Sequence, residues 1–453
     1  MKLNVSLTAS FLTGLSLVVL PMVASAASPV QLELYKRYVG TSDNMYLGSQ
    51  LITVPDMTGD ELDDYLIKDL SSDGTSYSHV ARILAGNAAG PVNGNLDRPA
   101  VATIYGELDR GLGTIEVMDV NADGQVDVIT THGNDMGGTF GAYVFYGLLS
   151  GSYTPADADA EFISNPVMYP YVRVTSTPDV TGDGQPELVF YQQYDTDGSS
   201  LPVGEIYIFT TPLTDTTINI TEDYTARVDG TYDTYTYNYD YLGLYSPIAG
   251  DFNHDDQNDL IVPGFGVSYI IPGPVNGQYE AFCKNDGYYF VSCTSYLPGG
   301  YTLSAGEVVL TQDINADTFD DFVIIDEDTI YGFTSAITGD TTTADADIVV
   351  TSDTTIRNIL PLADQNADGK MELIIWNETN AYVSNGLQSD DLANIGRPRF
   401  SLFLSKPTDT YKYTTAAKGD YNGDGKIDVL VSAPMTDRSG KTRNGIVRQF
   451  NQL

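Results

Sequence analysis

Histidine and cysteine are scarce in this chain, whose 453 residues include three histidines and two cysteines. His79, His132 and His254 stand in no H-E-x-x-H motif, and the sequence has neither a G-x-S-x-G elbow nor a glycine-rich phosphate loop. His254 lies inside an acidic loop, where we expect it to face solvent. His132, in His-Gly-Asn-Asp, is more typical of an ordinary loop histidine than of a general base. The sequence therefore predicts no catalytic residue and favours a protein that is not an enzyme.

Basic residues are also few, with 22 lysines and arginines against 61 aspartates and glutamates. Such an acidic chain is a poor partner for nucleic acid or for anionic membrane surfaces. High acidity can indicate disorder, but 42% of the residues are hydrophobic and many stand in regular strand-like runs. The composition therefore favours a folded protein.

Long apolar runs are absent beyond the N-terminus. Residues 1–26 combine Lys2, an apolar run that ends at Leu20 and the small residues Ala24-Ser-Ala26, which together predict a signal peptide. A transmembrane anchor is the alternative, but the apolar part is too short to span a bilayer. We expect a secreted protein, extracellular or periplasmic, without membrane insertion. Loss of Lys2 leaves 21 basic and 61 acidic residues, a net charge of −40.

An acidic nine-residue loop is what the chain has in abundance. Residues 420–428 read D-x-N-x-D-G-x-x-D, with oxygen-bearing side chains at positions 1, 3, 5 and 9 and glycine at position 6. Such a loop can curl around a hard cation that takes six to eight oxygen ligands, and position 7 can add its main-chain carbonyl. The glycine permits the sharp turn. A single match would equally fit a solvated acidic turn.

The pattern occurs seven times, at residues 56–64, 119–127, 179–187, 251–259, 313–321, 364–372 and 420–428, here named loops 1 to 7. Every loop has carboxylates at positions 1, 5 and 9 and Asn or Thr at position 3, a recurrence that chance does not explain. The chain is therefore predicted to bind up to seven Ca²⁺ ions. The predicted ligands at positions 1, 3, 5, 7 and 9 are Asp56, Thr58, Asp60, Leu62, Asp64, Asp119, Asn121, Asp123, Gln125, Asp127, Asp179, Thr181, Asp183, Gln185, Glu187, Asp251, Asn253, Asp255, Gln257, Asp259, Asp313, Asn315, Asp317, Phe319, Asp321, Asp364, Asn366, Asp368, Lys370, Glu372, Asp420, Asn422, Asp424, Lys426 and Asp428.

Loop 7 and the Val-Leu-Val-Ser-Ala-Pro434 that follows resemble the FG-GAP repeat of the integrin alpha-chain propeller and the related VCBS-type repeats of bacterial secreted proteins. Relics of the "FG" half stand at Leu47-Gly48, Leu112-Gly113 and Leu242-Gly243. The resemblance implies a β-propeller whose calcium loops join the first two strands of each blade on one face. It places the connections between blades on the opposite face.

The loops begin about 61 residues apart, and a repeat of that length holds roughly four short strands. We expect an all-β, seven-bladed propeller with four-stranded blades that fills residues 27–453 as one domain. After loop 7 the chain holds only two further strands. The alternating segment at 30–37 is therefore predicted to complete blade seven and close the ring, similar to integrin propellers.

Tyrosines are dense between residues 224 and 245, in the longest interval between loops. The plain interpretation is a strand whose tyrosine face packs on a neighbouring blade. The alternative is an exposed aromatic patch suited to protein or glycan recognition, on the face without calcium. The candidate ligand-binding residues are Tyr232, Tyr235, Tyr237, Tyr239 and Tyr241, with Tyr191 and Tyr194 from an earlier connection.

Cys283 and Cys293 flank an Asp-Gly pair that suits a tight hairpin turn. Two close cysteines in an exported protein predict a disulfide, and a metal pair lacks supporting histidines. Taken together, the sequence favours a secreted calcium-binding propeller that acts as an adhesion or recognition module for protein or glycan. The alternatives are a carbohydrate-active enzyme, such as a polysaccharide lyase or glycosidase, and a structural subunit of a surface assembly.

Overall fold

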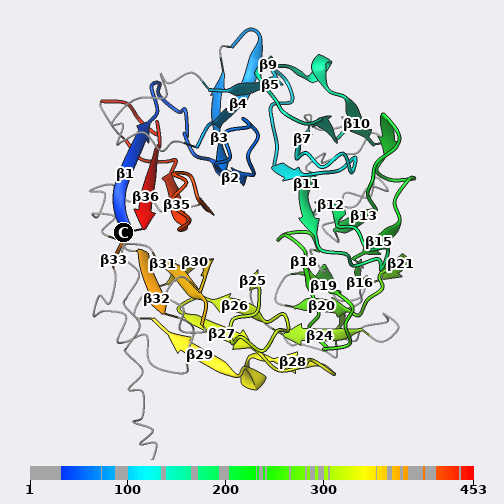
Figure 1. The fold of residues 1–453 in the computed structure, drawn as a ribbon. Coiled ribbons are helices and arrows are strands. Elements are labelled where there is room, and N and C mark those ends of the chain that lie inside the picture. Colours follow the sequence, from blue (N-terminus) through cyan, green and yellow to red (C-terminus); the bar gives the residue numbers. More distant parts are fainter. Residues whose placement is uncertain are drawn as a thin grey trace, which may run out of the picture.

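The computed structural model is an all-β propeller in which separate sheets are arranged around a ring (Figure 1). The structure describes residues 32–452 except 73, 87–99, 134–138, 165–171, 193–203, 231, 234–237, 240–241, 265–266, 281–282, 286–290, 294–299, 305–306, 353–354, 365–369, 378–380, 386–400, 403–414 and 438–439. The predicted signal peptide at 1–26 lies outside this part. Among the described residues, no helix is long and apolar enough to cross a membrane.

Four sheets have five strands each, three antiparallel pairings followed by one parallel pairing at the outer edge. In order from the centre outward, their strands are β2 (Gln50–Val54), β3 (Asp64–Ser72), β4 (Tyr77–Leu84), β5 (Ala102–Glu107) and β9 (Gly151–Tyr153); β6 (Ile115–Met118), β7 (Asp127–His132), β8 (Gly141–Phe145), β10 (Ala160–Ile163) and β14 (Thr217–Asn219); β11 (Arg173–Thr177), β12 (Glu187–Gln192), β13 (Glu205–Phe209), β15 (Ala226–Asp229) and β21 (Gly277–Glu280); and β18 (Ile248–Gly250), β19 (Asp259–Pro263), β20 (Ser268–Ile271), β24 (Tyr301–Ser304) and β28 (Thr341–Thr342).

Three further sheets have four strands each. These are β25 (Glu307–Thr311), β26 (Phe322–Asp326), β27 (Thr329–Phe333) and β29 (Ile348–Thr351); β30 (Ile356–Ala363), β31 (Glu372–Asn377), β32 (Ala381–Asn385) and β33 (Ser401–Leu402); and β34 (Thr415–Gly419), β35 (Asp428–Ala433), β36 (Ile446–Gln452) and β1 (Leu32–Val39). Two short hairpins, β16 (Tyr232–Asp233) with β17 (Asn238–Tyr239) and β22 (Cys283–Asn285) with β23 (Val291–Cys293), stand apart from these sheets, and two single-turn 3₁₀ helices cover Pro155–Asp157 and Thr343–Asp345.

The expectation of four strands in every blade was incomplete. In four sheets the fifth strand belongs to the next repeat along the chain. This short strand pairs in parallel with the outermost antiparallel strand of the preceding sheet. For example, Gly151–Tyr153, between β8 and β10, pairs with β5 of the preceding sheet. The added strand covers the outer edge of each of these sheets. An exposed edge could otherwise pair with another chain.

The core lies between neighbouring sheets. The second strands are mostly buried, and Asp127–His132 and Glu187–Gln192 are buried along their whole length, because both faces of each sheet are covered by other sheets. One cluster joins Val189 and Ile208 of one sheet to Leu260 and Val262 of the next. Apolar contact between sheets, rather than within one, therefore holds the ring together.

The two ends of the chain meet in one sheet. β1 pairs antiparallel with β36, from Leu32 opposite Gln452 to Val39 opposite Ile446. The segment predicted at 30–37 thus lies, shifted by two residues, at the outer edge of the sheet that carries loop 7. Nearer the centre, the Thr53 hydroxyl donates to the carbonyl of Lys418 at 2.5 Å and lies 2.8 Å from the Tyr421 hydroxyl.

Candidate metal centres on the acidic loops

Each acidic loop joins the first strand of its sheet to the second, so all seven occupy the same relative place in the fold. In loop 3 the Asp179 carboxylate accepts hydrogen bonds from the main-chain N–H groups of Gly182 (2.6 Å), Asp183 (3.1 Å) and Gly184 (2.7 Å). The position-1 aspartates of loops 1, 5 and 7 accept the same three bonds. The position-1 side chain therefore stabilises the curled conformation of its own loop.

Positions 4 and 6 both take the left-handed backbone conformation. In loop 7 these are Gly423 (φ 75°) and Gly425 (φ 77°). Glycine adopts this conformation without steric cost. Other loops place side chains there, including His254 at position 4 and Thr318 at position 6 (φ 80°). The sequence pattern indicated the turn at position 6 but not the one at position 4, which is Ala or His in four loops.

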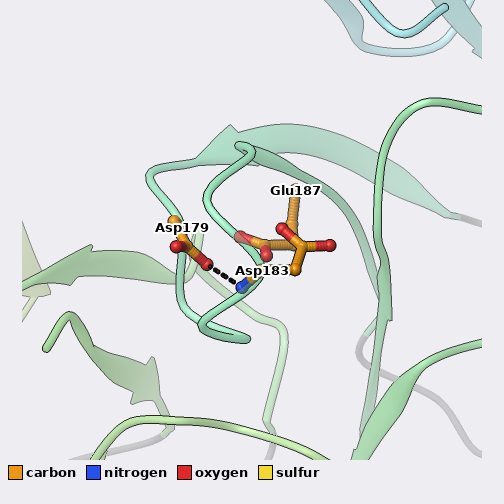
Figure 2. Close-up of side chains that lie close together, drawn as sticks. All are labelled: Asp179, Asp183 and Glu187. Atoms are coloured by element: carbon orange, nitrogen blue, oxygen red, sulfur yellow. Dashed lines mark hydrogen bonds between the residues drawn. The ribbon is translucent and has the colours of Figure 1, made fainter.

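Loop 3 brings three carboxylates together (Figure 2). Oxygen atoms of Asp179, Asp183 and Glu187 all lie within 4.8 Å of one another, and Glu187 is buried at the start of β12. An all-oxygen set of this kind suits a hard cation such as Ca²⁺. These are positions 1, 5 and 9 of the loop, and the sequence predicted that they converge.

The position-9 carboxylates are the most buried members of the loops. The side chains of Asp64, Asp127, Asp259 and Glu372 are fully buried, and each begins the second strand of its sheet. Burial raises the pKa of Asp259 to about 6 and that of Asp321 to about 7, while hydrogen bonds from main-chain N–H groups oppose the rise. A bound cation would offset the free-energy cost of burying these carboxylates in their charged form.

Among the loop residues that the structure describes, some buried oxygens lack a hydrogen-bond partner. They include Oδ1 of Asn253, at position 3 of loop 4, and Oδ1 of Asp321, at position 9 of loop 5. A buried polar atom without a partner carries a substantial free-energy cost. A cation ligated by these atoms would remove that cost, so the residues fit the proposed ion. In loop 6, residues 365–369 lie outside the described part, and the predicted ligands Asn366 and Asp368 are among them.

The three histidines serve the packing of the fold. His79 Nδ1 lies 3.0 Å from the carbonyl oxygen of Leu112, and the His254 ring stacks on Phe319 of the next loop with centroids 3.9 Å apart. His132 is 3% exposed and stacks on Tyr143, and neither of its ring nitrogens has a hydrogen-bond partner among the residues that the structure describes. Burial, aided by the charge of Arg110, lowers the pKa of His132 to about 4.

The tyrosine candidates divide into described and undescribed residues. Tyr232 is paired with Tyr239 in the register of the β16–β17 hairpin, whereas Tyr235, Tyr237, Tyr241 and Tyr194 lie outside the described residues. Tyr191 is 7% exposed and packs in the core between two sheets, so it offers a ligand little surface. The Arg173 guanidinium lies 6.0 Å from the centre of the Tyr191 ring.

Cys283 stands opposite Cys293 in the β22–β23 hairpin, and the disulfide between them stays a prediction.

Solved structures with a similar overall fold are distant in sequence. They include BBS1N in complex with ARL6DN (10% identity, TM-score 0.46, covering 92% of this chain and 96% of that one). Polycomb Repressive Complex 2 of Chaetomium thermophilum bound to GSK126 has 9% identity, a TM-score of 0.48 and coverages of 93% and 98%. Rhamnogalacturonan lyase YesW has 10% identity, a TM-score of 0.40 and coverages of 93% and 75%. Structural similarity at these low TM-scores does not indicate a function.

No curated protein sequence matches this chain. A family model does match, and its description is "FG-GAP repeat" over residues 413–448. The match covers β34, loop 7, β35 and the start of β36, the same segment whose motif suggested the resemblance. Together with the ring of sheets, this match supports an FG-GAP repeat β-propeller protein.

Proposed function

We propose that the acidic loops bind Ca²⁺ and that the protein is a secreted, calcium-stabilised propeller of seven blades, one for each loop. The observation that carries this proposal is the approach of the Asp179, Asp183 and Glu187 oxygens to within 4.8 Å of one another. Without a cation these carboxylates repel each other, and with one they supply three of the six to eight oxygens that Ca²⁺ takes. The main-chain carbonyl at position 7 and the position-3 side chain would complete the set.

Thermal unfolding in excess chelator and in millimolar Ca²⁺ tests this step. A cation that binds the folded state alone raises the melting temperature by mass action. Asp183→Asn should reduce the calcium-dependent rise, whereas Asp215→Asn, an exposed aspartate outside the loops, should leave it unchanged. Equal melting with and without Ca²⁺ contradicts the proposal. An equal rise with Mg²⁺ argues against calcium as the preferred ion, since Mg²⁺ requires a tighter octahedral site.

We infer that the propeller serves as an adhesion or recognition module, with its ligand on the face away from the acidic loops. Support comes from the tyrosine-rich segment around β16 and β17, which follows the last antiparallel strand of one sheet and precedes the first strand of the next. Tyrosine offers a large apolar surface with a polar tip, which suits glycan or protein ligands.

A glycan array probed with and without Ca²⁺ is the direct search for that ligand. Replacement of Tyr235, Tyr237 and Tyr239 by Ala should abolish binding to any glycan found, while the melting temperature shifts little. A marked loss of stability instead means that these side chains belong to the core, since each buried aromatic lost costs about 3–5 kcal/mol. Glycan cleavage detected in the same samples would favour the alternative, a carbohydrate-active enzyme.

A further inference from the structure

At some junctions, neighbouring acidic loops contact one another through the side chain at position 8. The main-chain N–H of Asp420, the first residue of loop 7, donates a 2.9 Å hydrogen bond to the carboxylate of Asp63, at position 8 of loop 1. The N–H of Asp251, the first residue of loop 4, donates in the same way to Asp320, at position 8 of loop 5, at 3.3 Å. Equivalent residues thus make an equivalent bond at two different junctions.

A third junction uses a related bond. The Asn258 side chain, at position 8 of loop 4, donates through Nδ2 to the carbonyl oxygen of Asp179, the first residue of loop 3, at 2.8 Å. Position 8 in loops 2, 3 and 7 is Val126, Pro186 or Ile427, whose side chains can neither donate nor accept a hydrogen bond. The bond is therefore specific to particular junctions and is not a general feature of the repeat.

A second contact accompanies the carboxylate at the same two junctions. The ring of Phe319, at position 7 of loop 5, stacks on that of His254, at position 4 of loop 4, at an interplanar angle of 8°. Leu62, at position 7 of loop 1, lies so close to loop 7 that a Cβ atom on Gly423 would come within 2.6 Å of its Cδ2. Positions 7 and 8 of one loop thus both rest on the preceding loop.

The residue after position 8 explains why this contact matters for a bound cation. Asp64 directly follows Asp63 and accepts hydrogen bonds from Met57 and Thr58 within its own loop, at 2.8 and 2.9 Å. Consecutive residues of an extended chain point to opposite sides. Asp63 therefore reaches loop 7 while Asp64 reaches the interior of loop 1, and an ion that orders either loop also restrains the other.

We propose that Asp63 and Asp320 are positioning residues that couple cation binding between neighbouring loops, loop 7 with loop 1 and loop 4 with loop 5. This inference rests on the proposed calcium binding. The junction between loops 7 and 1 joins the last sheet to the first, so coupling there ties calcium binding to closure of the ring. Coupling between sites is reciprocal, so calcium bound to either loop of a pair raises the calcium affinity of the other loop.

Hydrogen–deuterium exchange followed by mass spectrometry during a Ca²⁺ titration gives a separate calcium midpoint for each loop. Asp63→Ala should raise the midpoint of loop 7 about fivefold to tenfold, near the lower end of typical couplings. The midpoint of loop 3 should stay within about twofold of the wild-type value. Asp63→Asn, which keeps an acceptor oxygen, should restore much of the affinity. Glu61→Gln removes the same charge from loop 1 and should leave loop 7 unchanged.

Reciprocity supplies a second measurement. Asp424→Asn weakens loop 7 directly and should raise the midpoint of loop 1 in the wild-type background, but not in the Asp63→Ala background. Asp320→Ala should shift loop 4 and spare loop 7, and it tests the inference independently if Asp63→Ala fails to fold. Loop 7 midpoints within about twofold of wild type in Asp63→Ala, or an equal shift in all loops, would overturn the coupling. Absence of calcium-dependent protection in every wild-type loop would instead overturn the proposed function itself.

Discussion

His132 allows a sharp test of the buried interior. Its ring is 3% exposed and stacks on Tyr143 with centroids 4.4 Å apart, and both of its nitrogens lack hydrogen-bond partners within the described part of the chain. The charged groups that act electrostatically on this pair of rings include Arg110, Glu107 and Glu161. The perturbation we choose is His132→Phe, because phenylalanine keeps a planar ring for the stack and cannot take up a proton.

The pH dependence follows from the pKa of His132, which burial lowers to about 4 from the 6.5 of an exposed histidine. Between these values the unfolded chain binds a proton that the folded protein does not, so this histidine costs stability as the pH falls from 6.5 towards 4. The loss amounts to about 2 kcal/mol between pH 7 and pH 4.5. Removal of two buried nitrogens without partners should also stabilise the variant at pH 7, by about 1–3 kcal/mol.

The assay is urea unfolding of both proteins at pH 7 and pH 4.5, in the same concentration of Ca²⁺. Carboxylates titrate in both proteins, so their contributions cancel when the two unfolding free energies are subtracted. The advantage of His132→Phe should grow by about 2 kcal/mol at the lower pH. An advantage that is equal at both pH values would refute the reasoning.

Three other predictions follow from the loops, the chain ends and the ring centre. Thr318→Gly should raise the free energy of unfolding by about 1 kcal/mol in thermal melts, since a β-branched residue is strained at a φ of 80°; an unchanged or lower stability contradicts that account. Deletion of residues 27–39 removes the strand that pairs with β36 and should cause aggregation or a loss of several kcal/mol, as scattering and unfolding would show; a soluble and equally stable product excludes a closing role. Burial raises the pKa of Glu116 to about 7 from its ordinary 4.5, so the folded protein binds this proton more tightly than the unfolded chain and loses stability as the pH rises between these two values. Glu116→Gln should flatten that decline between about pH 5 and 7, and a decline as steep as in the wild type would count against it.

Much of the fold and of the candidate metal centres could be predicted from the sequence because the information is local and repeated. Nine residues suffice to set the loop, since Asp179 bonds to main-chain groups three to five residues further on. The period of about 61 residues then fixes the repetition of the sheet. The same local reasoning located the N-terminal strand, whose alternation is visible in the sequence and whose partner, β36, lacked an outer neighbour.

Other features depend on residues far apart in the chain, and only the tertiary structure decided them. The fifth strands arise because one repeat lies against the next, and nothing in Gly151–Tyr153 itself specifies a parallel partner. Tyr191 was predicted as a ligand residue from its place near a connection, but packing between sheets buries it. Asp63 meets Asp420 across 357 positions of sequence, and an aspartate at position 8 looks like any other surface acid until the ring brings the two loops together. Local hydrogen bonding determined the form of each loop, whereas the contact between loops exists only because the sheets are held around a common ring.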